Sequence, residues 1–432
     1  MNFQLLTIVC CFISCTNILY GVEEKDLLLR AEFDVQEAIW VSWSSDQAKI
    51  GCPYSHPQTD IIQALVRYIP VKVFVSNLDE LVKAKAMLET NNTHIDRLSY
   101  YVMSSENIWL RDICTALLSN QYDMKAIPDF AFNGYGSEPF LNTSQLAGNK
   151  SDAEFRKFLG RLLQLPVFSS DLVSEGGNRE TNGRGTLLVT DAVDRQRNPK
   201  MTDIERIEKY KNTLNVRKVI CLNKGLVQDD QLFMGPVYGP DGGKTAYTTL
   251  GNGGHVDAFC RFVGPHTIVL AEVDKEEAKT DPIAAENRRR LEENYVILKN
   301  STDQDEHPFE ILRMPAASTF YVKMGPGDPI FDFLVSLNFN GIPTLPINQH
   351  PLEKEALFLI SMSYLNFLIS NEVVLVAKYW KDGYPDIIKR KDEQALRILR
   401  DIFPDKDIIQ IDVFNLNLCG GGIHCLTQYE SI

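Results

Sequence analysis

Apolar runs with strand character alternate with amphipathic segments along most of the chain. Residues 37–43 (EAIWVSW) form a strand-like run, residues 59–69 repeat their apolar positions with a helical period, and residues 71–75 (VKVFV) are strand-like again. The same alternation predicts helices over residues 78–88, 203–211, 282–298 and 392–402, and strands over 100–102, 186–190, 218–222, 267–273 and 408–413. Strands that alternate with helices in this way indicate an α/β protein.

One segment breaks this alternation. Residues 236–254 (PVYGPDGGKTAYTTLGNGG) are rich in glycine and proline, which predicts an irregular loop. Loops of this length often act as lids or binding loops, although an ordinary surface loop has the same composition. The segment leads directly into His255, and this adjacency favours a lid.

The length of 432 residues is compatible with two or three domains or with one large domain. No Pro/Ser-rich linker or charge block divides the chain, so we expect a single domain over residues 22–432. Residues 5–19 form an apolar stretch that is too short to span a bilayer and matches the hydrophobic region of a signal peptide. We therefore predict a signal peptide over residues 1–21, a secreted protein, and no membrane span in the mature chain.

The formal net charge of the chain is −13. An acidic surface disfavours nucleic acid and anionic membranes as partners and favours cationic ligands, although solubility alone accounts for it equally well. Of the nine cysteines, the six that follow the apolar N-terminal stretch are widely spaced, unlike the disulfide framework of a small scaffold. The cysteine count does not define the cellular compartment.

The candidate chemistry follows glycine-rich positions. Three glycines at positions 420–422 lead into His424 and Cys425. A cysteine that follows such a run on a strand-like element is a candidate nucleophile, because glycines let the backbone approach a ligand closely. His255 and Asp257 follow a second group of glycines, and on an extended strand they would share one face and could supply proton transfer and charge. A structural histidine in the core is the alternative for His255.

Neighbouring residues of a strand point to opposite faces, so His424 is a poor base for Cys425. We expect His255 to be the base and His424 to be packed or hydrogen-bonded beneath the site. Trp109, Arg111 and Asp112 lie within four residues, where a flat cation could contact the indole and pair with the carboxylate. A core tryptophan beside a surface ion pair is the commoner state of such a tetrad.

Five motifs together suggest a family. W-x-R-D (109–112), E-G-G-N (175–178), N-G-G-H-x-D (252–257), S-Y-L-N-F (363–367) and G-G-G-I-H-C (420–425) occur in this order. The set spans roughly residues 30–430 and resembles the guanidine-modifying superfamily, specifically the family that joins agmatine deiminases and Porphyromonas-type peptidylarginine deiminases. The resemblance implies a five-bladed pseudosymmetric α/β propeller, the pentein fold, with a central active site. We expect no cofactor and no metal.

Carried over motif by motif, the resemblance implies Cys425 as nucleophile, His255 as acid and base, and Asp112 and Asp257 as anchors of the guanidinium. Cys425 would attack the guanidinium carbon, and His255 would protonate the nitrogen that leaves as ammonia. Water would then resolve the covalent thiouronium to a ureido product. Because like charges raise a thiol pKa, we expect a largely neutral Cys425 until the cationic substrate binds.

The resemblance also places Trp109 on the pocket wall and Asn366 in contact with the substrate, and gives Glu175 a supporting role, although Glu175 could belong to a simple turn. Residues 113–115 (ICT) replace the T-G-P usual in agmatine deiminases, and residues 178–180 (NRE) replace S-x-H. These departures and the signal-like N-terminus favour conversion of peptidyl-arginine to citrulline and ammonia. Deimination of agmatine to N-carbamoylputrescine is the alternative.

Three other classes compete with this interpretation. A cysteine hydrolase of amides or peptides would use the same Cys–His–Asp set, but it would not need the second carboxylate of Asp112. His255, Asp257, Cys260 and Cys425 could ligate a metal, although their spacing fits no structural zinc motif. A non-catalytic secreted binder is the third alternative.

Overall fold

The structure is a computed structural model that describes residues 27–45, 54–90, 94–103, 105, 107–138, 143–230, 235–336 and 355–432. The signal peptide predicted over residues 1–21 lies outside the described residues. No helix in the described ranges is long and apolar enough to cross a membrane.

The predicted α/β class is confirmed, and several predicted elements agree with the observed bounds residue for residue. The helices are α1 (Ser55–Leu65), α2 (Leu78–Leu88), α3 (Leu110–Ile113), α4 (Thr143–Ala153), α5 (Phe155–Leu163), α6 (Asp191–Arg197), α7 (Asp203–Leu214), α8 (Glu277–Thr280), α9 (Pro282–Lys299), α10 (Pro329–Ser336), α11 (Asp386–Ile402), α12 (Phe414–Leu418) and α13 (Ile423–Leu426). Side-chain caps define the first residues of several helices. Asn77 accepts the Glu80 N–H at the start of α2, and Asp281, which precedes the proline of α9, accepts the N–H groups of Ile283 and Ala284.

Five sheets of the described chain share one pairing pattern, in which a central strand has an antiparallel strand on one side and a parallel strand on the other. In order across each sheet they are β1 (Leu28–Leu29), β5 (Leu118–Ser119), β6 (Lys125–Ala131) and β7 (Val167–Val173); β8 (Glu180–Thr181), β9 (Thr186–Thr190) and β10 (Lys218–Leu222); β13 (Cys260–Phe262), β14 (Thr267–Glu272) and β15 (Glu310–Pro315); β18 (Leu368–Ile369), β19 (Val373–Lys378) and β20 (Asp407–Asp412); and β21 (Thr427–Ser431), β2 (Gln36–Ser42), β3 (Val71–Val75) and β4 (Leu98–Val102). Each parallel pair is joined by a helical crossover, as parallel strands require.

A further sheet corrects the prediction of an irregular loop over residues 236–254. It contains β11 (Val237–Tyr238), β12 (Lys244–Thr248), β17 (Ala356–Leu359) and β16 (Tyr321–Met324), in that order. β11 and β12 form a hairpin around the glycines, and β12 then pairs in parallel with β17. The glycines and the proline between residues 239 and 243 therefore form the turn of a hairpin, and β12 is ordered by a distant strand.

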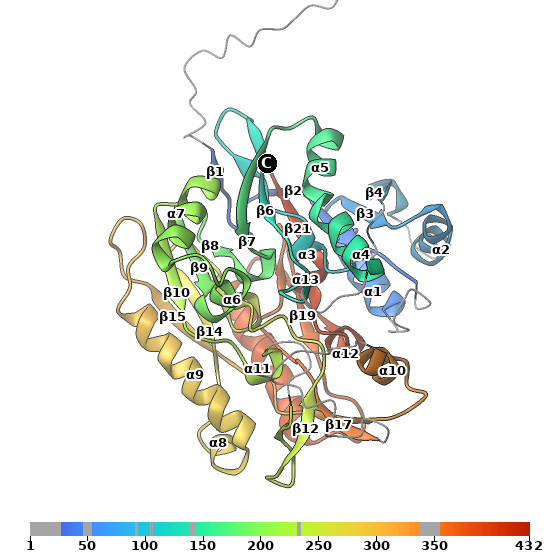
Figure 1. Ribbon diagram of the computed structural model, residues 1–432, viewed down its shortest axis with the longest axis vertical. Coiled ribbons are helices and arrows are strands. Elements are labelled where there is room, and N and C mark those ends of the chain that lie inside the picture. The colour runs from blue at the N-terminus through green and yellow to red at the C-terminus, as the bar shows by residue number, and fades with distance from the viewer. Residues whose placement is uncertain are drawn as a thin grey trace, which may run out of the picture.

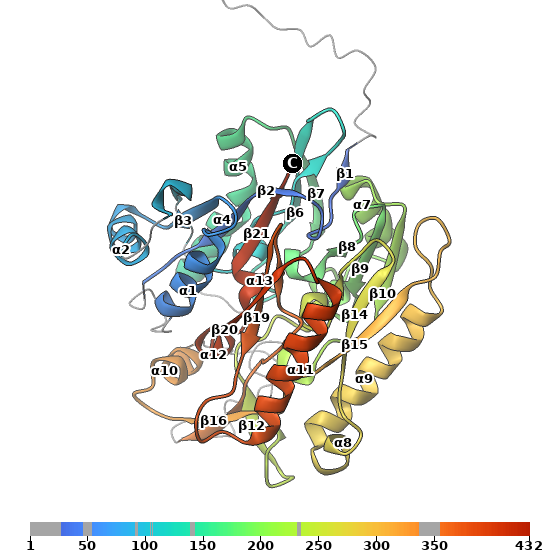
Figure 2. The same ribbon diagram turned by 180° about the vertical axis from the view of Figure 1, so that it is seen from behind.

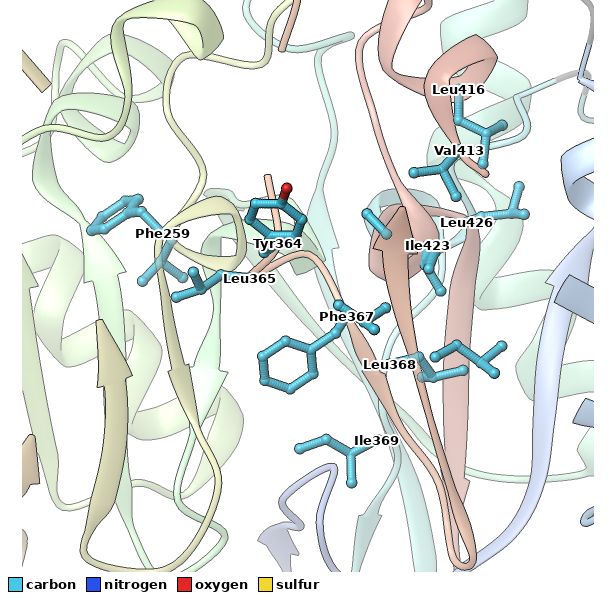
Figure 3. Close-up of a cluster of buried hydrophobic side chains, with 14 of the residues drawn as sticks. Phe259, Tyr364, Leu365, Phe367, Leu368, Ile369, Val413, Leu416, Ile423 and Leu426 are labelled. Carbon is cyan, nitrogen blue, oxygen red and sulfur yellow. The ribbon is translucent and has the colours of Figure 1, made fainter. Parts of the chain in front are cut away.

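The ends of the described chain meet in one sheet, because β21 pairs with β2 antiparallel. Figures 1 and 2 show α2, α7 and α9 at the periphery and α13 near the middle of the molecule. Ile423 and Leu426 of α13 belong to a buried apolar cluster that also contains Phe367, Leu368 and Leu416 (Figure 3). This cluster gives the residues between Ile423 and Leu426 a rigid support.

Candidate active site

Cys425 lies on α13 and is 4% exposed. The strand predicted for it is wrong, because Gly420 takes a left-handed φ of +95° and the chain turns into a single helical turn. The Asn366 amide holds this turn: its oxygen accepts the His424 N–H at 3.0 Å and the Cys425 N–H at 3.4 Å. Its nitrogen donates to the Cys425 sulfur at 3.3 Å. Asn366 therefore contacts the candidate nucleophile directly and fixes its direction.

Asp257 lies on a short turn, the 3₁₀ helix Val256–Ala258, and His255 is the N-cap residue that precedes it, so the predicted strand is wrong here as well. Gly253 and Gly254, with φ of +96° and +95°, redirect the chain before His255. Both side chains nevertheless enter the same buried site, where the Cys425 thiol donates to the Asp257 carboxylate at 3.8 Å.

Three predicted site residues converge on Gly177. A β-carbon at this glycine would lie 2.5 Å from His255 Nδ1, 3.0 Å from Asp257 Oδ2 and 3.1 Å from Asp112 Oδ1. The Gly177 N–H donates to Asp112 at 2.9 Å. One oxygen of Asp257 and Nδ1 of His255 are buried without a hydrogen-bond partner among the described residues. Such groups are expected to have a partner, so a polar or cationic ligand fits here.

The charge balance around His255 favours its protonated form. Burial lowers the pKa of His255, but Asp112, Glu175 and Asp257 outweigh it and raise the pKa to about 9. Glu175 lies 3.4 Å from His255 Nε2 and 2.7 Å from the Arg197 guanidinium. Burial raises the pKa of Glu175, yet Arg197 and His255 bring it down to about 2. His255 is thus a buried imidazole that is favoured in its protonated form, and the Glu175 carboxylate lies beside its Nε2.

The two carboxylates beside His255 differ in charge environment. Burial raises the pKa of Asp112, even though the Tyr135 hydroxyl donates to it at 3.1 Å. Burial acts in the same direction on Asp257, but its hydrogen bond to the His424 cation leaves the pKa lowered. Burial, then Asp257 and Asp112, raises the pKa of the Cys425 thiol well above its usual range. This direction agrees with the neutral thiol expected from the sequence.

Trp109 is half-buried and borders the cysteine turn, because a β-carbon at Gly421 would overlap its ring. The structure therefore brings together Cys425, His255, Asp112, Asp257, Asn366, Glu175 and Trp109. Arg111, the cation of the same tetrad, pairs with Glu32 at 2.6 Å.

Sequence analysis missed an ionic chain beneath Asp257. His424 Nδ1 lies 2.7 Å from Asp257 and its Nε2 lies 2.9 Å from Glu32. Both neighbours are carboxylates, which suits an imidazolium that donates from both nitrogens. Glu32 also pairs with Arg111 and with Arg261, 2.8 Å away. Burial opposes its charge, but these cations hold the pKa of Glu32 well below its ordinary value.

A second missed residue, Asp229, borders the turn that precedes His255. It is 2% exposed, and its Oδ1 accepts the Asn252 N–H at 3.4 Å. Its Oδ2 has no partner in the described part of the chain. Burial raises the pKa of Asp229 to about 7 although His255 lowers it. In the sequence, the only sign of this residue is the pair Asp229–Asp230 before the glycine-rich hairpin. Because the hairpin separates this pair from His255 along the chain, the sequence does not indicate that Asp229 lies beside His255.

An α/β fold with a buried cysteine, a histidine and two carboxylates around one glycine defines a guanidine-modifying enzyme, a hydrolase of C–N bonds in linear amidines. The family model of the Porphyromonas-type peptidyl-arginine deiminases matches residues 28–234 and 243–430, and the chain belongs to this family. The gap between the two matched ranges, residues 235–242, covers β11 and most of the turn before β12.

The curated relatives are full-length matches. The agmatine deiminase of Medicago truncatula is 25% identical over 93% of this chain and 95% of its own length. An agmatine deiminase of Pseudomonas aeruginosa is 25% identical over 93% and 94%. Among solved structures, agmatine deiminase of Enterococcus faecalis has a TM-score of 0.71 at 22% identity over 95% and 98%. A putative arginine deiminase of Porphyromonas gingivalis has a TM-score of 0.67 at 24% identity over 93% and 98%. These structures have the same fold.

Proposed function

We propose that the protein hydrolyses the guanidinium group of agmatine to N-carbamoylputrescine and ammonia. The observation that carries the chemistry is the convergence of His255, Asp112 and Asp257 on Gly177, with the Cys425 thiol in contact with Asp257. Two carboxylates in one buried site suit a planar guanidinium cation, which each can bind through paired hydrogen bonds. The names of the curated relatives support agmatine as the compound that carries this group.

Catalysis begins with the neutral thiol. A bound guanidinium offsets the charge of Asp112 and Asp257, so the Cys425 proton leaves to solvent and the thiolate attacks the guanidinium carbon. The new S–C bond produces a neutral tetrahedral adduct. His255, protonated because its pKa is about 9, gives its proton to one amino group, and the C–N bond breaks to release ammonia. A cationic thiouronium on Cys425 remains.

Water completes the cycle. The neutral His255 takes a proton from water, and the oxygen adds to the thiouronium carbon. When the adduct collapses, the S–C bond breaks and the hydroxyl proton passes to the Cys425 sulfur. The ureido product then leaves, with the thiol and the imidazolium restored. The ionic chain through His424 holds Asp257 in place but exchanges no proton in this scheme.

Asp229 supports a substrate with a second positive charge. The carboxyl is buried beside the His255 turn, no described cation pairs with it, and its pKa of about 7 leaves it readily ionised by an approaching ammonium. The terminal amine of agmatine supplies such a group. We therefore assign Asp229 to the tail of the substrate.

Peptidyl-arginine is the second candidate substrate. The description of the matched family favours it, as do the departures at residues 113–115 and 178–180. Ammonia release should be measured with agmatine, free arginine and an arginine peptide blocked at both ends, with Cys425→Ala as the control. The proposal predicts that agmatine has the highest kcat/KM. A higher value for the blocked peptide would replace agmatine by peptidyl-arginine.

We also propose three features that were expected from the sequence, namely the propeller, the single domain and secretion. The repeated pairing pattern of five sheets supports a five-bladed propeller around Cys425. The family match over residues 28–234 and 243–430 supports one catalytic domain over residues 22–432. A disulfide at Cys419 supports secretion after removal of residues 1–21, because disulfides persist in oxidising compartments. N-terminal sequencing of the protein recovered from culture medium tests the last point.

A further inference from the structure

A cluster of two histidines and one aspartate lies outside the catalytic machinery. His266 occupies the turn between β13 and β14, and Asp303 and His307 belong to the loop between α9 and β15. His266 Nδ1 lies 2.9 Å and His307 Nδ1 lies 3.3 Å from the same Asp303 oxygen, Oδ2. One ligand atom from each residue lies within 4.8 Å of the others. We propose that these three residues bind a divalent transition-metal ion of the zinc class.

The distances fit this class of ion. Zinc binds imidazole nitrogen and carboxylate oxygen at about 2.0–2.2 Å in a tetrahedron, so neighbouring ligand atoms should be roughly 3.3 Å apart. The two N–O separations are 2.9 and 3.3 Å, close to that value before any ion is bound. Two imidazoles favour zinc, nickel or copper over magnesium or calcium, which prefer oxygen ligands. Solvent fills the fourth position, because the side chains of His266 and His307 are 51% and 62% exposed.

The backbone holds the ligands in place. The Asp303 side chain is fully buried, and its Oδ1 accepts the N–H groups of Asp305 at 2.8 Å and His307 at 2.9 Å. Oδ2 is thereby directed at the two imidazoles. The Glu310 N–H donates to the His266 carbonyl at 2.9 Å, which ties the two segments together.

A bound ion would join the β13–β14 turn to the 302–308 loop. β13 carries Arg261, which pairs with Glu32 beneath the active site. The ion lies apart from Cys425 and takes no part in deimination. Its effect should be on stability, because an ion that binds only the folded state raises the unfolding temperature with concentration.

Calorimetric titration with zinc chloride tests the site, using the full chain in a Cys425→Ala background so that the catalytic thiol does not bind zinc. We expect one zinc per chain, and binding at least about tenfold weaker in His266→Gln and in His307→Gln, since even second-sphere losses cost that much. His56→Gln, an exposed histidine on α1, is the matched control and should bind zinc unchanged.

Thermal unfolding gives an independent readout. Zinc should raise the unfolding temperature of the Cys425→Ala parent and of His56→Gln, but not that of the two site variants, which should fold normally because both side chains are exposed. Absence of zinc binding by the parent, or equal affinity in His266→Gln and His307→Gln, would overturn the assignment. Magnesium chloride should produce no shift, and a shift equal to that of zinc would also contradict it.

Discussion

Replacing His424 by glutamine removes the cation between Asp257 and Glu32 while leaving a hydrogen-bonding side chain. The three side chains are 1–4% exposed, and the ring lies 2.7 and 2.9 Å from the two carboxylates. Breaking a buried ion pair costs about 3–5 kcal/mol. Glu32 keeps Arg111 and Arg261, whereas Asp257 loses its closest cation, so we expect the lower end of that range, about 3 kcal/mol.

This loss can be measured by calorimetry. With an unfolding entropy of about 2.1 cal/mol/K per residue, a chain of this size should lose roughly 3 °C in unfolding temperature. His56→Gln, an exposed histidine, should stay within about 0.5 kcal/mol of the native protein. Deimination should also fall by at least about a hundredfold, because Asp257 would no longer be held in register. A His424→Gln protein with native stability would refute the account of His424 as a buried cation.

Four further predictions concern the catalytic groups. The pKa of His255 is raised from 6.5 to about 9, so its ion pairs contribute their full stabilisation of the fold below about pH 6.5. This contribution to the free energy of unfolding is roughly 3 kcal/mol, and it is lost as pH rises through about 9. Urea unfolding of His255→Gln should lack that pH dependence. Alkylation of Cys425 in the free enzyme should keep rising above pH 9, and a plateau near neutral pH would disprove the neutral thiol. Gly177→Ala should lower kcat/KM by about a hundredfold or more because the new methyl group enters the site. Normal turnover by this variant would show that Gly177 does not border the site where the substrate binds. Asp229→Asn should raise KM for agmatine about tenfold or more and leave an alkylguanidine without the amine unaffected; equal effects on both compounds would remove Asp229 from the tail site.

The fold class was predictable because long elements have clear periods. Strands 71–75 and 218–222 and helix 78–88 were predicted with their observed bounds. The hairpin over residues 237–248 was not, because β12 is completed by β17, more than a hundred residues further along the chain. Local composition contains no information on such a partner, and glycines that form its turn resemble those of an irregular loop.

The candidate site was predictable as a set of residues but not as a geometry. Cys425 and His255 both lie on single turns that follow glycines with positive φ, and one turn is too short to show a helical period. Glu32 could not be found, because its partner Arg261 is 229 positions away and each looks like an ordinary surface charge in the sequence. Asn366 was expected at the substrate, and the structure shows its side chain hydrogen-bonded to the Cys425 thiol.

The central claim is that Cys425 forms a covalent bond to the guanidinium carbon. Mass spectrometry of enzyme quenched during turnover of agmatine tests it most directly. The account predicts a mass increase equal to agmatine minus ammonia on the peptide that contains Cys425, and neither adduct nor ammonia release in Cys425→Ala. Ammonia release by Cys425→Ala at the native rate, or an adduct on another residue, would contradict it.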